Sequence, residues 1–132
     1  MDEKTPKPLW ILAVRADFSA AHALRHYQGK CEAVHGHNFA VEITVQGSKL
    51  TPDTGLLVDF KDLKTDLQTV LSGLDHQDLN RLPAFTRLNP SSENIAAHIY
   101  RELLPLMRAR DVRLRSVSVS EKNAQTATYM EE

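Results

Sequence analysis

The sequence predicts an α+β domain built around an antiparallel β-sheet. Two strand-like patterns open the 132-residue chain, two helical patterns follow in its middle, and two further strand-like patterns end it. Helices that alternate one by one with strands favour a parallel sheet, whereas helices grouped between pairs of strands favour an antiparallel one. A chain of this length has room for one domain. We expect that domain to span residues 9–132, after a flexible tail at residues 1–8.

The first two strands are predicted by side-chain alternation. Apolar residues take every second position from Trp10 to Phe18, while the charged residues of this segment take the other parity. A clearer alternation runs from Phe39 to Val45, and Gly47 ends it. One face of each strand is therefore expected to lie on the core.

A turn-rich stretch leads into the first helix. Residues 56–58 are expected to form a short strand, and Asp59 is placed to cap a helix whose apolar positions recur at intervals of three and four over residues 63–74. This stripe is expected to pack on the sheet. Residues 74–89 then form a long connection, and such connections in small domains are more often functional or partly structured than idle.

The second helix and the last two strands complete the pattern. Ser91 or Ser92 can cap the helix, and Pro105 is expected to end or kink it. Residues 112–120 form the next expected strand, within which the apolar parity switches and indicates a bulge. Residues 126–129 are expected to form the last strand.

The composition argues against several kinds of partner. Sixteen Lys and Arg residues oppose seventeen Asp and Glu residues, and the resulting net charge of -1 lacks the positive field that sequence-independent nucleic-acid binding needs. The longest apolar run, Leu9 to Val14, is far shorter than the roughly 20 residues of a membrane-spanning helix. The N-terminus combines mixed charge with two prolines, unlike a signal or transit peptide. We expect a cytoplasmic protein without direct nucleic-acid or membrane partners.

Histidines gather in one stretch of the chain, close to its single cysteine. His35 and His37 are one residue apart and therefore share a face of a strand. His22 has the parity of the inward residues of the first strand, so an antiparallel pair of strands would bring all three imidazoles to one end of the sheet. Three neutral imidazoles with an open fourth position suit a catalytic Zn²⁺ that holds a water or substrate oxygen.

Cys31 leaves several interpretations open. It can be a buried small side chain, a fourth zinc ligand in a closed structural site, or a thiolate near the metal that acts as a base or nucleophile. Because the chain has one cysteine, an intramolecular disulfide is excluded.

Two further positions carry side chains suited to acid–base chemistry or to binding. Asp75 precedes His76, and a carboxylate beside an imidazole can orient the ring and stabilise its charged form. Glu121 ends an apolar strand. There a carboxylate is either solvated or able to accept two parallel hydrogen bonds from an amidine-like pair of N–H groups, such as a pterin or guanine edge.

Six segments of the chain, taken in order, are more specific together than any one motif. They are Phe18-Ser19-Ala20-Ala21-His22, Cys31-x3-His35-Gly36-His37-Asn38, Gly55-x3-Asp59-Phe60, Leu74-Asp75-His76-x2-Leu79-Asn80, Asn89-Pro90-Ser91-Ser92-Glu93-Asn94 and Glu121. This series resembles the 6-pyruvoyltetrahydropterin synthase family from about Phe18 to Tyr129. The spacing of Cys31 and His35 resembles the bacterial branch of the family, the 6-carboxy-5,6,7,8-tetrahydropterin synthases of queuosine biosynthesis.

The resemblance implies a tunnelling fold, in which the sheets of several subunits join into a barrel. Two such rings would stack as a homohexamer with active sites between subunits. The resemblance also assigns roles to the residues above. His22, His35 and His37 would bind Zn²⁺, Cys31 would be the catalytic thiol with Asp75 and His76 as its acid–base partners, Glu121 would anchor the pterin, and Ser91, Ser92 and Glu93 would line the pterin pocket.

The implied reaction converts 7,8-dihydroneopterin triphosphate to 6-carboxy-5,6,7,8-tetrahydropterin, acetaldehyde and triphosphate. The nearest alternatives are a member of this family that only eliminates triphosphate to give the pyruvoyl product, and a relative that cleaves the side chain of dihydroneopterin. An alternative of another class is a zinc-stabilised binding module without catalysis, in which Cys31 is the fourth metal ligand.

Overall fold

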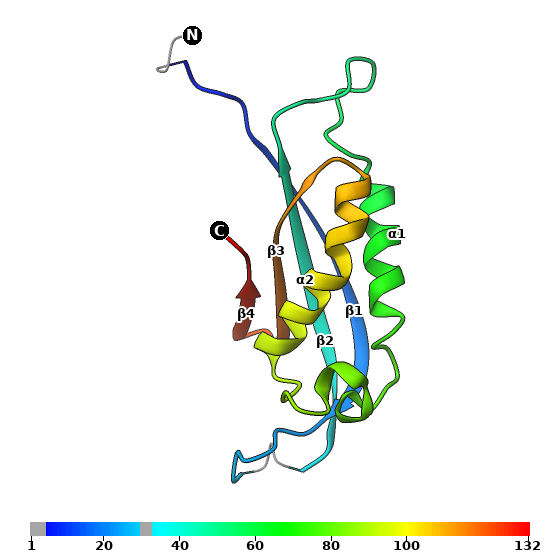
Figure 1. The fold of residues 1–132 in the computed structure, drawn as a ribbon, viewed down its shortest axis with the longest axis vertical. Helices are drawn as coiled ribbons and strands as arrows, with labels where there is room; N and C mark the ends of the chain where they lie inside the picture. The colour runs from blue at the N-terminus through cyan, green and yellow to red at the C-terminus, as the bar shows by residue number, and fades with distance from the viewer. Residues whose placement is uncertain (1–4, 30–32) are drawn as a thin grey trace.

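The computed structural model describes residues 5–29 and 33–132 and contains one antiparallel sheet, covered on one face by two helices (Figure 1). Across the sheet the strands lie in the order β1 (Trp10–His22), β2 (His35–Gly47), β3 (Arg113–Lys122) and β4 (Gln125–Tyr129). The helices are α1 (Phe60–Leu71) and α2 (Ser92–Ala109), with two short 3₁₀ helices, η2 (Leu79–Arg81) and η3 (Pro83–Phe85), between them in the chain. The predicted α+β class and antiparallel pairing are confirmed.

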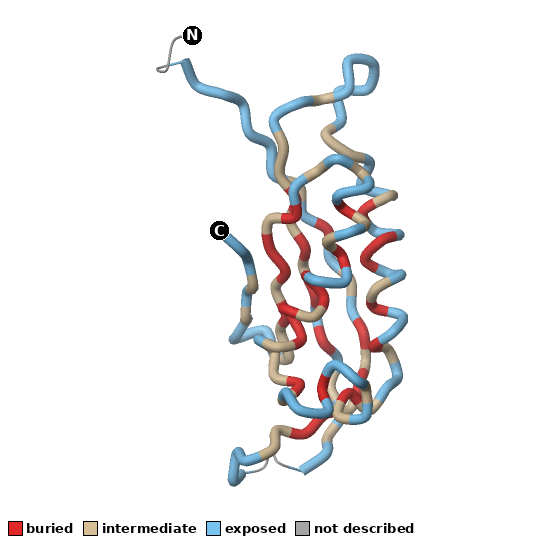
Figure 2. The backbone as a smooth tube through the Cα atoms, viewed as in Figure 1, coloured by how far each residue is buried: buried red, intermediate tan, exposed pale blue. Residues whose placement is uncertain are grey.

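The hydrophobic core lies between the sheet and the helices, where the buried backbone segments face one another in Figure 2. Even-numbered residues of β1 and odd-numbered residues of β2 point inward, as the alternation predicts. Phe18 stacks on Phe39 across these two strands, with ring centroids 4.9 Å apart. Leu63 of α1 and Leu103 of α2 are fully buried against the same core. Burial of one sheet face fixes the register of the strands, because a slip of one residue would turn every apolar side chain outward.

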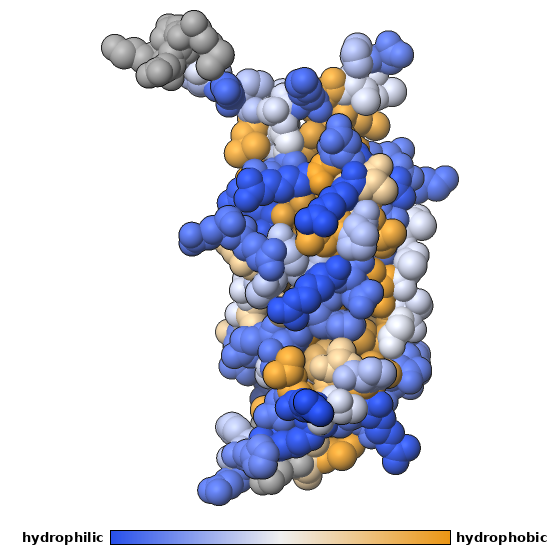
Figure 3. Space-filling view, viewed as in Figure 1, coloured by the Kyte–Doolittle hydropathy of each residue, from blue (hydrophilic) through white to orange (hydrophobic). Residues whose placement is uncertain are grey.

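The opposite face of the sheet is polar, and none of the described helices covers it. Side chains on neighbouring strands pair across it: Arg15 with Glu42, Ser19 with Asn38, Thr44 with Ser116, Ser118 with Thr128, and Ser120 with Thr126. The outward side of the helix layer is also largely hydrophilic, with narrower apolar areas between the polar side chains (Figure 3). Within the described chain, neither helix combines the length and apolar character needed to cross a bilayer.

Three local predictions are confirmed by backbone geometry. Asp59 caps α1, since its side chain accepts a hydrogen bond from Lys61 N at 2.8 Å. Ser91 caps α2 and accepts from Asn94 N at 3.1 Å. The expected bulge lies in β3 at Arg115, where the register with β2 shifts by one residue. Signals of this kind are local, so the sequence suffices to find them.

The short strand expected at residues 56–58 is wrong. Leu56 instead closes a loop, in which its carbonyl accepts from Thr51 N at 2.8 Å and its own N–H donates to Thr51 Oγ1 at 3.2 Å. The apolar character of the segment comes from Leu57, which packs against the core edge and would meet any side chain at Gly47. Tertiary packing, not strand pairing, explains these apolar residues.

Of the two outcomes expected at Pro105, an end of α2 is wrong, because the helix continues to Ala109. Proline removes one backbone hydrogen bond, that of the carbonyl four residues earlier, on Arg101. Both Pro105 and Arg101 are exposed, so this carbonyl can be hydrated. Met107 in the following turn is fully buried, and its packing favours continuation of the helix.

Candidate functional site

Three histidines meet at one end of the β1–β2 pair. His22 lies directly opposite His35, and Ala20 lies opposite His37, so the antiparallel register brings the three imidazoles to the same inward face. Ring centroids are 4.6 Å apart for His22 and His35, 4.7 Å for His35 and His37, and 5.5 Å for His22 and His37. The juxtaposition expected from strand parity is therefore present.

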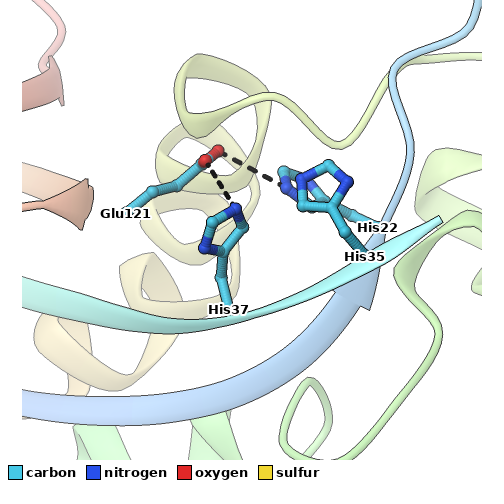
Figure 4. A group of neighbouring side chains, drawn as sticks. All are labelled: His22, His35, His37 and Glu121. Atoms are coloured by element: carbon cyan, nitrogen blue, oxygen red, sulfur yellow. Dashed lines mark ion pairs between the residues drawn. The ribbon is translucent and has the colours of Figure 1, made fainter. Parts of the chain in front are cut away.

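Glu121, at the end of β3, extends its carboxylate into this group of imidazoles (Figure 4). Its Oε2 lies 3.3 Å from His37 Nε2, and its Oε1 lies 3.5 Å from His22 Nε2. One ligand atom from each of the four residues lies within 4.8 Å of the others. The sequence suggested Glu121 as a substrate-binding residue and missed its place beside the histidines. One signal in the sequence could have indicated this position: Glu121 follows the inward-facing Val119 by two residues, so both side chains lie on the same face of the strand.

Two of the imidazoles are oriented by backbone carbonyls. His22 Nδ1 lies 2.7 Å from the Pro90 oxygen, and His35 Nδ1 lies 2.8 Å from the Ala33 oxygen. A carbonyl can only accept, so each Nδ1 carries the hydrogen and each Nε2 keeps a free lone pair. His22 Nε2 is buried and has no hydrogen-bond partner among the described residues. A bare, buried nitrogen within a set of three imidazoles and one carboxylate fits a bound metal ion, and this donor set suits Zn²⁺.

The electrostatics keep His22 neutral. Burial lowers its pKa from the ordinary value of 6.5, and the neighbouring His35 and His37 lower the pKa further. The Pro90 carbonyl and the Glu121 charge act in the opposite direction but do not offset the burial. A neutral imidazole is the form that binds a metal, so the site needs no proton release from His22 at neutral pH.

Asp75 and His76 lie apart from the four-residue cluster, at the outer edge of β1. Asp75 Oδ1 accepts from Ser19 N at 2.9 Å, and the N–H of His76 donates to the Ser19 carbonyl at 2.6 Å. These contacts clamp the dyad to the strand, although His76 adopts a left-handed backbone with φ of 59°. The carboxylate Oδ2 lies 3.0 Å from His76 Nδ1, while the His76 side chain is 81% exposed. The imidazole is thus oriented by its own chain but faces outward.

The pKa of Asp75 is lowered, first by the Ser19 N–H and also by His76. The carboxylate therefore stays ionised and can keep the Nδ1–H of the imidazole in place. His76 and His37 border the same open surface pocket of about 590 Å³. The dyad therefore adjoins the end of the sheet at which the histidines lie, on its solvent-facing side.

The remaining predicted site residues take different positions. Ser92 Oγ lies 3.4 Å from Glu121 Oε1, so this serine joins the cluster. The Ser91 hydroxyl serves as the cap of α2, and Glu93 is exposed in the first turn of that helix. Cys31 lies outside the described residues.

The fold and the site define a small α+β protein with a metal-type histidine and carboxylate cluster at one end of its sheet. The family model of 6-pyruvoyl tetrahydropterin synthase matches residues 11–132. A Synechocystis sp. protein named 6-carboxy-5,6,7,8-tetrahydropterin synthase is 36% identical over 92% of this chain and 93% of its own. A Pyrococcus furiosus protein named dihydroneopterin monophosphate aldolase is also 36% identical, over 83% of this chain and 87% of its own.

Solved structures agree with this similarity. The Caenorhabditis elegans 6-pyruvoyl tetrahydropterin synthase superposes with a TM-score of 0.85 at 27% identity, covering 95% of this chain and 97% of that one. The chain therefore belongs to the 6-pyruvoyl tetrahydropterin synthase family. Its subunit has the tunnelling fold that the sequence motifs implied.

Proposed function

We propose that this protein is a zinc-dependent carbon–carbon lyase acting on 7,8-dihydroneopterin triphosphate. With one water consumed, its products would be 6-carboxy-5,6,7,8-tetrahydropterin, acetaldehyde and triphosphate, in queuosine biosynthesis. The observation that carries the proposal is the convergence of His22, His35 and His37, two of them with Nδ1 on a backbone carbonyl, in a member of a pterin synthase family. The similarity to the Synechocystis sp. protein favours the carboxy product.

The cluster divides naturally into metal binding and substrate binding. The three histidines would hold Zn²⁺, which when bound supplies a Lewis acid for the side-chain oxygens of the substrate. Glu121 would accept two N–H groups from the pterin edge, because its two carboxylate oxygens match such a pair. Ser92, already 3.4 Å from that carboxylate, would line the same pocket. Ser91 and Glu93 would line that pocket from the start of α2.

Proton transfer would fall to Cys31, Asp75 and His76. Asp75 holds Nδ1 of His76, which leaves Nε2 able to accept and release a proton. Cys31 lies in the chain between His22, which ends β1, and His35, which begins β2. We propose that its thiol transfers a proton at the site. Because His76 faces outward from its own chain, we propose that it serves the site of a neighbouring subunit in a homohexamer.

Product analysis tests the reaction. Zinc-loaded protein incubated with 7,8-dihydroneopterin triphosphate should release acetaldehyde and triphosphate in equal amounts. Triphosphate without acetaldehyde would refute the carboxy assignment in favour of a pyruvoyl product. Turnover restricted to the monophosphate would favour the aldolase activity named for the Pyrococcus furiosus relative.

Metal analysis separates the catalytic site from a closed structural one. Cys31→Ala should retain one zinc per chain and lose turnover, because three histidines suffice to hold the ion. His22→Ala should lose the metal. Loss of zinc from Cys31→Ala would instead favour the non-catalytic module with Cys31 as a ligand.

Mixed oligomers test the shared site. Cys31→Ala and His76→Ala should each be inactive alone, whereas random co-assembly should restore about a quarter of the wild-type sites, those that pair an intact thiol with an intact imidazole. A site contained within one chain predicts no recovery. An inactive mixture of confirmed mixed composition would therefore refute the intersubunit arrangement.

A further inference from the structure

A backbone carbonyl from a distant part of the chain orients the His22 imidazole. The Pro90 oxygen lies 2.7 Å from His22 Nδ1, although the two residues are 68 positions apart in the sequence. This contact selects the tautomer whose Nε2 is free for a metal. The orientation of His22 therefore depends on the contacts that hold Pro90 against the end of β1.

The Asn89 side chain makes such a contact. Its Oδ1 accepts from Arg25 N at 2.9 Å, and its Nδ2 donates to the Arg25 carbonyl at 2.9 Å. One amide thus satisfies both backbone groups of a residue that has left the sheet, as a neighbouring strand would. The Asn89 backbone is in turn tied to α2, because Asn94 Nδ2 donates to its carbonyl at 2.8 Å.

The Asn80 side chain binds Ala23 in the same way, two residues before Arg25. Its Oδ1 accepts from Ala23 N at 2.8 Å, and its Nδ2 donates to the Ala23 carbonyl at 3.0 Å. The Arg25 guanidinium reinforces both clamps, donating to the carbonyls of Phe85 at 2.7 Å, Leu88 at 3.2 Å and Asn80 at 3.3 Å. The segment immediately after His22 is thereby held to the connection that ends at Pro90.

We propose that Asn89 is a positioning residue of the metal centre, which fixes the Pro90 carbonyl on His22 Nδ1 and so presents Nε2 to the ion, with Asn80 in support. This inference rests on the metal site of the proposed function. Asparagine is suited to the role because the clamp uses one donor and one acceptor. Aspartate would keep only the acceptor, and alanine would keep neither.

The test compares the zinc affinities of Asn89→Ala and Asn89→Asp with that of Asp66→Ala, by competition with a chelating dye. The Asp66 carboxylate accepts two hydrogen bonds from Arg110, which lies at the opposite end of α2 from Pro90. Asp66→Ala therefore removes as many hydrogen bonds without touching the clamp. Loss of a supporting contact typically weakens metal binding by about 10- to 100-fold. We expect that loss in Asn89→Ala, a smaller loss in Asn89→Asp and no change in the control.

Unchanged affinity in folded Asn89→Ala, or an equal loss in Asp66→Ala, would overturn the inference. If Asn89→Ala does not fold, the comparison of Asn89→Asp with the control decides the question in the same way. The tautomer of His22 provides a readout that general destabilisation does not move.

Nitrogen NMR of the metal-free protein at about pH 8, where an ordinary imidazole is neutral, reports that tautomer. Wild-type His22 should carry its hydrogen on Nδ1, and Asn89→Ala should give a mixture of tautomers. A wild-type Nε2–H form, or an unaltered tautomer in the variant, would contradict the inference. A wild-type protein that binds no zinc would refute the proposed function, and the tautomer comparison would still decide the role of Asn89.

Discussion

Replacement of Glu121 by glutamine distinguishes a substrate anchor from an essential metal ligand. In the structure the carboxylate lies 3.3 Å from His37 Nε2 and 3.5 Å from His22 Nε2. It is therefore close enough to the histidines either to bind the metal with them or to bind a substrate beside them. Glutamine has the same shape but one acceptor oxygen and one NH₂ group. If Glu121 anchors the pterin, the amide presents a donor where the substrate also has a donor.

The magnitude follows from the two hydrogen bonds. A bond to a charged partner contributes about 1.5–3 kcal/mol, and an unsatisfied buried donor costs about 1–3 kcal/mol. The Glu121 side chain is 21% exposed, which permits some hydration and favours the lower part of the summed range. We therefore expect kcat/KM to fall by about 100- to 1,000-fold, or about 3–4 kcal/mol of transition-state stabilisation.

The assay pairs kinetics with zinc titration, and Glu42→Gln is its matched control. Glu42 lies on the opposite face of the sheet, where it pairs with Arg15. The Glu121→Gln protein should keep its zinc within about tenfold of the wild-type affinity, because three imidazoles are enough for a catalytic site. The control should keep both activity and zinc. Zinc loss from Glu121→Gln as large as that from His37→Ala would refute the anchor assignment and make Glu121 a metal ligand.

Three further predictions concern the framework of the site. Phe39 is fully buried and stacks on Phe18, so Phe39→Ala should lower the free energy of unfolding by about 3–5 kcal/mol in urea titrations, whereas Phe60→Ala, at a position 49% exposed, should cost far less. Ser91→Ala removes the cap of α2 and should cost about 1 kcal/mol, and equal stability of the two proteins would contradict the capping role. Burial lowers the pKa of His98 below 6.5, more than the opposing Glu102 raises it. Below pH 6.5 the unfolded chain therefore binds more protons at this residue than the folded chain does. The contribution of the neutral His98 to folding stability is present above pH 6.5 and is lost as pH falls. Metal-free His98→Gln should consequently lose less stability on acidification than the wild type, and identical pH profiles would disprove this.

Periodic and local features of the sequence predicted most of the fold. Strand alternation placed His22, His35 and His37 on one face, and the antiparallel pair brought them together because parity and register are linked. The helix caps at Asp59 and Ser91 were found because a cap is recognised within a few residues. Such patterns report which way a side chain points, not what it meets.

The errors and omissions have non-local causes. Pro105 was expected to end or kink α2, and the helix does not end there, because burial of Met107 two residues later favours its continuation. The approach of Glu121 to the histidines joins residues from opposite ends of the chain. No periodicity in the sequence reports such a distance.

The sequence by itself determined the α+β class, the inward parity of the three histidines and the family resemblance, because alternation, caps and motif order are properties of short segments. Only the tertiary structure decided that Pro90 orients His22, that Asn89 clamps Arg25, and that the Asp75–His76 dyad faces outward from its own chain. Each of these depends on hydrogen bonds between segments more than 50 residues apart, as between His22 and Pro90 at 68 positions and Ser19 and Asp75 at 56. Every residue has a backbone carbonyl and every residue except proline has a backbone N–H, so the sequence does not show which of these groups will meet until the chain folds.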